Sequence, residues 1–208
     1  MSYIGSRPAN KPVVASDLDP TVITGQTALA TSPADTDEFL ISDAGVLKRL
    51  DASLIGGGKI GQVVQTVKTD HASTTSTSYA DISGMSVNIT PSATSSKILV
   101  LANVNTGQTL NYSSAVQLMR DTTALFIGDA SSSRTRGSAG GISPKARGSQ
   151  QRNIHYLDSP SSTSALTYKL QWLVESGSSL YLNRDEGNAD AVYSIMCASS
   201  ITVMEVLA

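Results

Sequence analysis

The chain has 208 residues, of which 15% are charged and 5% aromatic, and its formal net charge is −2. That length suits one β-sandwich with an appendage and is too short for two large domains. Residues 1–60 hold five Lys/Arg against seven Asp/Glu, and residues 61–208 hold ten of each. Neither part is basic enough to attract nucleic acid, and the low share of charged side chains favours a structural role over an enzymatic one.

The chain carries no signal for export or membrane insertion that we can identify. Its start has no basic segment followed by an apolar run of signal-peptide length. Nowhere do about eighteen apolar residues follow one another, as a membrane-spanning helix requires. The one cysteine, Cys197, excludes an intrachain disulfide.

Residues 1–33 are predicted to form an extended arm. Pro8, Pro12, Pro20 and Gly25 interrupt this stretch, and its apolar residues follow neither a helical nor a strand period. An arm of this kind buries too little apolar surface to order itself, so it is either disordered or lies against another protein. Its high Val/Ile/Leu content favours the second alternative.

Residues 34–60 are predicted to form a small hairpin and a connector. Phe39–Ser42 and Val46–Leu50 read as two short strands around a turn at Asp43–Gly45. Asp51–Ile55 is compatible with one capped helical turn. Gly56–Gly58 closes the segment as a flexible joint.

Residues 61–208 read as a series of short strands, typical of an antiparallel β-sandwich. Turn residues separate these segments, and most are rich in β-branched side chains. The predicted strands are Gln62–Lys68, Met85–Thr90, Lys97–Val104, Ala115–Arg120, Thr123–Ile127, Asn153–Leu157, Ala165–Glu175 and Ser199–Val206, with a shorter one at Ser179–Asn183.

Two of these strands show different burial patterns. In residues 166–174 apolar and polar residues alternate, which predicts one buried and one hydrated face. Residues 97–104 are apolar at nearly every position, as expected of a strand covered on both sides. In a sandwich of this size, a neighbouring subunit is one candidate for the second cover.

A long basic loop is predicted between residues 128 and 152. It is rich in Gly and Ser, and loops of this length are usually functional or mobile. Its cations are candidate contacts to an anionic host-surface polysaccharide, although a solvated loop without a ligand is the plainer interpretation. These cations are Arg134, Arg136, Lys145, Arg147 and Arg152.

The sequence offers no catalytic, cofactor or metal site. It lacks a phosphate-binding GxxxxGK[ST] loop and any Cys/His cluster with zinc-ligand spacing. Asp185, Glu186 and Asp190 cluster near a strand end, where two alternatives are a polysaccharide-cleaving carboxylate pair or a Ca²⁺ site. A hydrated turn is the interpretation that we favour, so no enzyme activity, cofactor or metal is expected.

Several segments resemble tail fibre proteins of marine tailed bacteriophages. The opening Ser2–Gly5 with Pro8–Val13 is similar to the start of such fibres, and Ala34–Gly45 with Leu47–Arg49 is similar to their connecting element. The last part resembles a fibre-tip module. The segments that carry this likeness are Gly61–Gln65, Thr74–Tyr79, Thr94–Val100, Tyr156–Pro160 and Ser200–Val206.

The resemblance implies an all-β chain with three parts: an extended virion-docking arm (1–33), a small hairpin and Gly-rich connector (34–60), and a jelly-roll-like antiparallel β-sandwich tip module (61–208). It also implies a short homotrimeric tail fibre, made in the host cytoplasm, that joins other virion proteins through residues 1–60 and contacts a host surface glycan. The alternative is a capsid decoration, head fibre or baseplate adaptor without receptor binding, because the long shaft of most fibres is missing here. Neither nucleic-acid binding nor membrane insertion is expected.

Overall fold

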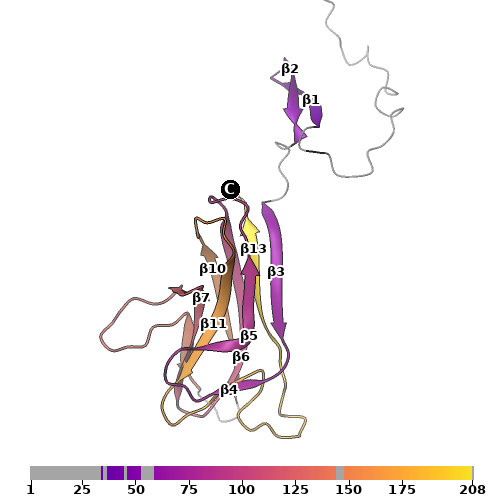
Figure 1. Ribbon diagram of the computed structural model, residues 1–208. Helices are drawn as coiled ribbons and strands as arrows, with labels where there is room; N and C mark the ends of the chain where they lie inside the picture. Colours follow the sequence, from indigo (N-terminus) through magenta and orange to yellow (C-terminus); the bar gives the residue numbers. More distant parts are fainter. Residues whose placement is uncertain (1–33, 35–36, 45, 53–58, 144–147, 208) are drawn as a thin grey trace, which may run out of the picture. The chain divides into compact units, whose positions relative to one another are not determined.

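The computed structural model describes residues 34, 37–44, 46–52, 59–143 and 148–207 (Figure 1). The predicted arm at 1–33, the glycines 56–58 and most of the helical turn predicted at 51–55 lie outside the described residues. The chain divides into two units, 1–56 and 57–208, and each is described by itself. Within the described residues, no helix is long and apolar enough to span a membrane.

The first unit contains the predicted hairpin. Strands β1 (Glu38–Asp43) and β2 (Val46–Asp51) pair antiparallel in a register from Glu38↔Asp51 to Asp43↔Val46. The two-residue loop begins at Ala44, whose φ of 50° matches the positive φ that tight hairpin turns need. Lys48 pairs with Asp43, and Arg49 lies 3.2 Å from Glu38. Both ion pairs are exposed, so they stabilise the hairpin little.

The second unit is an antiparallel sandwich of two sheets, which we call sheet 1 and sheet 2 (Figure 1). Sheet 1 contains β3 (Ile60–Lys68), β4 (Ala72–Thr74), β6 (Lys97–Gln108), β10 (Ser149–Asp158), β12 (Leu180–Leu182) and β13 (Ser199–Val206). Sheet 2 contains β5 (Ala80–Ile89), β7 (Ser113–Arg120), β8 (Thr123–Leu125), β9 (Ala139–Ile142) and β11 (Leu166–Val174).

Each sheet is effectively four strands wide. Along one side of β6, β13 pairs with residues 97–103 and β12 with residues 106–108, while β10 follows the other side. In sheet 2, β9 and β8 pair with successive parts of β7 in the same way. The chain therefore alternates between a sheet ordered β3-β13-β6-β10 and one ordered β5-β11-β7-β8, which is the strand order of a jelly roll.

The structure corrects several predicted boundaries. Strands β5, β6 and β10 begin earlier or end later than the sequence indicated, and two short strands were missed. These are β4 and the Gly-containing β9, which are three and four residues long and carry one β-branched residue each, Thr74 and Ile142. The predicted loop 128–152 is wrong in extent, because β9 interrupts it and β10 already begins at Ser149.

The hydrophobic core lies between the two sheets. On β11, Leu166, Tyr168, Leu170, Trp172 and Val174 are buried and alternate with half-buried residues, which confirms the predicted face. Trp172 is 4% exposed. On β6, Ile98, Val100, Ala102 and Val104 point into the same core. The intervening Leu99 and Leu101 lie on the outer face of sheet 1, where they are only half-buried.

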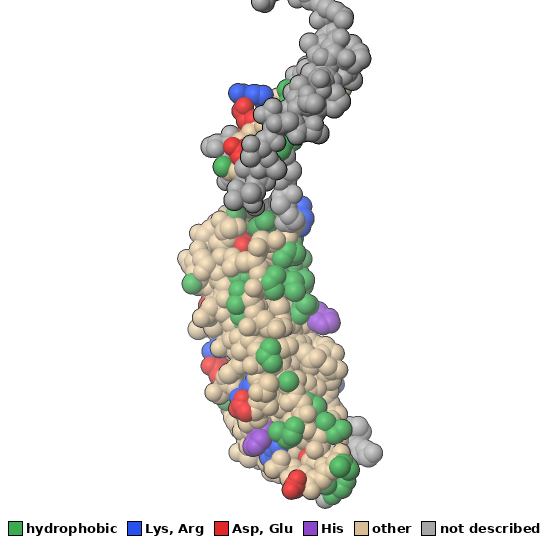
Figure 2. All heavy atoms as spheres, turned by 90° about the vertical axis from the view of Figure 1, so that its right-hand side faces the viewer, with side chains coloured by type: hydrophobic (Ala, Val, Ile, Leu, Met, Phe, Trp, Pro, Cys, Tyr) green, Lys and Arg blue, Asp and Glu red, His purple; other side chains and the backbone are tan. Residues whose placement is uncertain are grey.

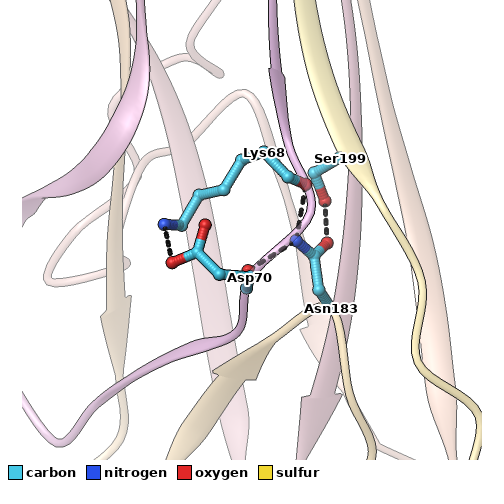
Figure 3. A network of polar contacts seen from close by, with 4 residues as sticks. All are labelled: Lys68, Asp70, Asn183 and Ser199. Carbon is cyan, nitrogen blue, oxygen red and sulfur yellow. Dashed lines mark hydrogen bonds and ion pairs between the residues drawn. The ribbon is translucent and has the colours of Figure 1, made fainter.

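A buried amide joins three segments at one end of sheet 1 (Figure 3). The Nδ2 group of Asn183 donates to the carbonyl oxygens of Lys68 and Asp70, at 2.8 and 2.9 Å, and its Oδ1 accepts from Ser199 Oγ at 2.6 Å. Asn183 is fully buried, and its φ of 60° is in the left-handed region that Asn tolerates better than most residues. The amide thus closes the ends of β3, β12 and β13 together.

A buried carboxylate holds the turn before β6. Glu205, on β13, accepts hydrogen bonds from Gln62 Nε2 at 2.8 Å and from both the backbone N and Oγ of Ser92 at 2.6 Å. Burial alone would raise the pKa of Glu205, but these hydrogen bonds outweigh it and lower the pKa to about 2. The side chain is therefore a charged anchor between β3, β13 and the 90–96 turn.

Candidate functional site

A groove of about 650 Å³ lies on sheet 2 where β7, β9 and the end of β11 meet the segment before β9. Small and hydroxyl side chains form most of its lining, with one cation and one anion. The lining residues are Thr77, Ser113, Ser114, Ala115, Arg134, Thr135, Gly137, Ala139, Gly140, Gly141, Leu173, Val174 and Glu175.

Hydrogen bonds tie one wall of the groove to sheet 2. Tyr79 Oη donates to the Arg136 carbonyl at 2.6 Å, and Arg136 Nε donates to the Gly128 carbonyl at 2.5 Å. Ser138 donates its backbone N–H to the Val116 carbonyl at 2.9 Å. The wall also packs closely, because a Cβ on Gly137 would lie 2.7 Å from Tyr79 Oη. Segment 128–138 is thus attached to the rest of the module at Arg136 and Ser138, and the Arg136–Gly128 hydrogen bond closes it on itself.

The two charged side chains of the groove differ in their partners. Glu175 Oε2 accepts from the backbone N of Ser113 at 2.9 Å, and the backbone N of Glu175 donates back to the Ser113 carbonyl at 2.9 Å. Arg134 is exposed and forms no ion pair with any described residue. The groove therefore combines an oriented carboxylate with a guanidinium that is available to a ligand.

Arg152 is not a surface residue, which corrects its prediction as a host contact. It is 6% exposed on β10 and donates to Thr106 Oγ1 (3.2 Å), Gln108 Oε1 (3.2 Å), and the carbonyl (3.1 Å) and Oγ (2.5 Å) of Ser114. Burial lowers its pKa to about 10, so the guanidinium stays charged at neutral pH. None of these acceptors is a carboxylate. Because Ser114 lines the groove, the charge lies directly behind the groove's floor.

The other predicted basic contacts are dispersed. Arg134 lines the groove, whereas Arg136 is exposed beside it and uses its Nε group within the wall. Lys145 and Arg147 lie outside the described residues. Sequence reasoning missed Thr77, Ser113 and Glu175, which come from three separate segments and share no local motif.

The acidic cluster near β12 organises its own loop. Asp185 is buried, and its Oδ1 accepts from the backbone N of Asn188 at 2.7 Å and from Ser194 Oγ at 2.9 Å. Glu186 is half-buried and Asp190 exposed. Across the described part of the chain, no three His, Cys, Asp or Glu side chains are placed to hold a metal ion.

A second surface feature is the outer face of sheet 1. The register places Val63, Met204, Leu99 and Leu157 side by side across four strands, and we call this set the apolar row. Val63 is 56% and Leu157 46% exposed. Figure 2, which faces the β3 side of the module, shows one group of hydrophobic side chains near the end where β3 begins and another at the opposite end.

On one side of the apolar row, the two neighbouring rows are mostly polar and almost free of charge, whereas on its other side the exposed Lys97 lies opposite Val206. The next row is Gln65, Thr202, Leu101 and His155, and the third is Val67, Ser200, Asn103 and Asn153. Gln65 Nε2 donates to Thr202 Oγ1 at 2.8 Å within this face. His155 is the one titratable side chain in the three rows. Such a surface suits burial against a protein partner.

The fold and these surfaces define an all-β jelly-roll module with a groove on one sheet and an apolar row on the other. No family model matches the chain, and no curated protein matches it. Solved structures of virus particles are similar to it at low sequence identity.

One match is a structure of infectious bursal disease virus Gt strain, at 13% identity and TM-score 0.40, over 79% of this chain and 45% of that chain. A second is of T=1 particles derived from infectious bursal virus, at 15% identity and TM-score 0.39, over 80% and 39%. A third is a VP2 subviral particle of that virus, at 13% identity and TM-score 0.38, over 80% and 40%. This chain spans less than half the length of these matched chains. Because their TM-scores are below 0.5, the jelly-roll assignment is based on the strand order alone.

Proposed function

We propose that this chain is a non-enzymatic virion structural protein, a short homotrimeric tail fibre. In this proposal residues 1–60 attach it to other virion proteins, and the jelly-roll module faces outward to contact the host surface. The observation that carries the proposal is the apolar row on sheet 1, which suits a module that assembles with copies of itself. The sequence resemblance to phage tail fibres supports the same assignment.

A second copy of this chain is the partner that the apolar row fits. Burying such side chains stabilises an interface by roughly 25 cal/mol per Å² of apolar surface. Around a three-fold axis, the rows of three copies converge, and the residues nearest the axis meet their own equivalents. Like charges would oppose such contacts, and the three rows contain none apart from the imidazole of His155.

The mass of the isolated full chain in solution, measured by light scattering at micromolar concentration, tests self-association. We expect three copies. Leu99→Lys should yield folded monomers, because it places a charge in the centre of the row. Ser83→Lys, which adds the same charge at an exposed position on β5 of sheet 2, should leave the trimer intact. A wild-type chain that remains monomeric would refute assembly through this face.

Cryo-electron microscopy of the intact particle tests the location. Three-fold density on the tail, with the jelly-roll module distal, is the expected result. Density on the capsid surface would replace the fibre by a decoration protein, and density within a baseplate would replace it by an adaptor.

A further inference from the structure

We propose that the groove on sheet 2 binds a saccharide that carries a carboxylate, with the acid at Arg134 and neutral hydroxyl groups toward Glu175. This inference rests on the proposed host-contacting function and names the ligand class for it. It follows from the size of the groove, its lining, its charges and its fixed wall.

The groove has the dimensions of a ligand site rather than of a surface irregularity. Its volume of about 650 Å³ lies inside the range of roughly 300–1,000 Å³ that is usual for small-molecule sites. Ala115 contributes little bulk, and no protein atom lies within 4 Å of the place that a Cβ on Gly141 would take, so space is left there for a ligand. The hydroxyl groups of Thr77, Ser113 and Thr135 give the lining donors and acceptors that match sugar hydroxyls.

The charges select an acidic sugar over a neutral one. Arg134 presents a planar guanidinium, whose geometry matches a carboxylate through two parallel hydrogen bonds. Behind the floor, the Arg152 guanidinium contacts only neutral acceptors, so its positive charge is not cancelled by a neighbouring carboxylate. In a low-dielectric interior such a charge acts over a longer distance than in water. Both cations therefore favour an anion in the groove.

Glu175 limits how many negative charges a ligand can bring. Its carboxylate is oriented by the Ser113 backbone and lines the same groove as Arg134. A dense polyanion would place like charge against it, whereas a sugar hydroxyl can donate to it. The arrangement thus fits a ligand with one carboxylate followed by neutral sugar hydroxyls, and it disfavours polyphosphates and nucleic acids.

The wall is held in place before any ligand arrives. The hydrogen bonds of Tyr79, Arg136 and Ser138 fix segment 128–138, which carries Arg134 and Thr135. A site that is already ordered loses less conformational entropy on binding. Weak binding at each groove is sufficient in a multivalent fibre, because linked copies raise the effective concentration.

The test compares two disaccharides that differ only at their terminal sugar, glucuronic acid in one and glucose in the other. Saturation-transfer NMR with the full-length protein at millimolar ligand measures binding of each. We expect the glucuronic acid form to bind in preference. Arg134→Gln should weaken its binding by roughly ten- to hundredfold, the effect of a lost charge-assisted hydrogen-bond pair, and abolish the preference.

Two further variants test whether the disaccharide binds in the groove. Thr77→Trp places a large ring at an exposed lining position and should block both disaccharides without touching the core. Lys97→Gln removes one exposed cation from the opposite end of β6, roughly 35 Å along the strand from its groove-side end, and should bind as wild type. Unchanged circular dichroism confirms that each variant is folded.

Failure of the saccharide site and failure of the proposed virion role give different results. No binding of either disaccharide to the wild-type chain overturns the saccharide site, and equal binding of both overturns the carboxylate preference. Loss of binding in Lys97→Gln overturns the location. Any of these results leaves the virion role standing if particle images place the chain on the tail. Images that place it elsewhere refute the fibre without altering the binding result.

Discussion

Asn183 should contribute to the stability of the module on the scale of a buried Leu or Ile side chain, through hydrogen bonds. Asn183→Ala removes the amide group that donates to the carbonyl oxygens of Lys68 and Asp70 and accepts from Ser199 Oγ. A buried polar group left without its partner costs about 1–3 kcal/mol. The Lys68 and Ser199 groups are buried, whereas water can reach Asp70, so the network accounts for about 2–5 kcal/mol. Holding Ala at a φ of 60° adds about 1 kcal/mol.

The assay is equilibrium unfolding in urea, followed by the fluorescence of Trp172. We expect Asn183→Ala to lower the free energy of unfolding by about 3–6 kcal/mol in total, a large part of a typical domain's stability. Asn188→Ala is the matched control for backbone strain, because Asn188 also has a positive φ, of 44°, but is exposed. That control should cost about 1 kcal/mol. Equal losses in the two variants would refute the argument from the buried network.

Asn183→Asp separates hydrogen-bond polarity from size. The carboxylate still accepts from Ser199 but turns an acceptor toward the two carbonyl oxygens of Lys68 and Asp70. Those oxygens and burial raise the pKa of the introduced carboxyl in the folded state above its unfolded value. The variant should therefore regain stability as the pH falls, and its deficit should grow as the pH rises through the folded pKa. A deficit that does not change with pH would contradict this reasoning.

Three further predictions concern other parts of the chain. Trp172→Ala should cost about 3–5 kcal/mol by opening a cavity between the sheets. Because Trp172 is the one tryptophan of the chain, urea unfolding of this variant is followed by circular dichroism. A loss below about 1 kcal/mol would mean that the indole is not packed. Glu205 has a folded pKa of about 2 against an ordinary 4.5, so the stability that it contributes is complete above pH 4.5 and disappears as the pH falls toward 2. Glu205→Gln should therefore lower the free energy of unfolding by on the order of 1–3 kcal/mol at pH 7 and flatten its pH dependence between pH 4.5 and 2. An unchanged pH profile would contradict the anchor role. Deleting residues 1–33 should leave a soluble trimer that no longer joins the virion, and particles that still carry the truncated chain would show that another segment attaches it.

Strand periodicity predicted much of the fold. The alternation in β11 identified the buried face of Trp172. The apolar pattern of β6 predicted cover on both faces; one face lies in the core, and cover over Leu99 and Leu101 by a neighbouring subunit stays a prediction. The short strands β4 and β9 could not be predicted, because one β-branched residue among Ala, Ser or Gly is too weak a signal and the strand geometry comes from pairing with β12 and β7.

The inward orientation of Arg152 could have been predicted from strand alternation. Ile154 points into the core, so a strand that begins two or more residues earlier places Arg152 on the same inward face. The groove itself had no such signal. Thr77, Ser113 and Glu175 belong to segments that are separated along the chain by two sheet crossings or more, and Arg134 joins them through the pairing of β9 with β7.

The position of β13 constrains the order in which the module can fold. This last strand pairs with β3, the first strand of the module, on one side and with β6 on the other. A chain still being synthesised holds β3 and one side of β6 without their main partner until Ser199–Val206 has left the ribosome. Contacts between such distant segments form slowly, and unpaired strand edges promote aggregation in the meantime. Truncation of the last few residues should therefore damage the whole of sheet 1 rather than shorten it.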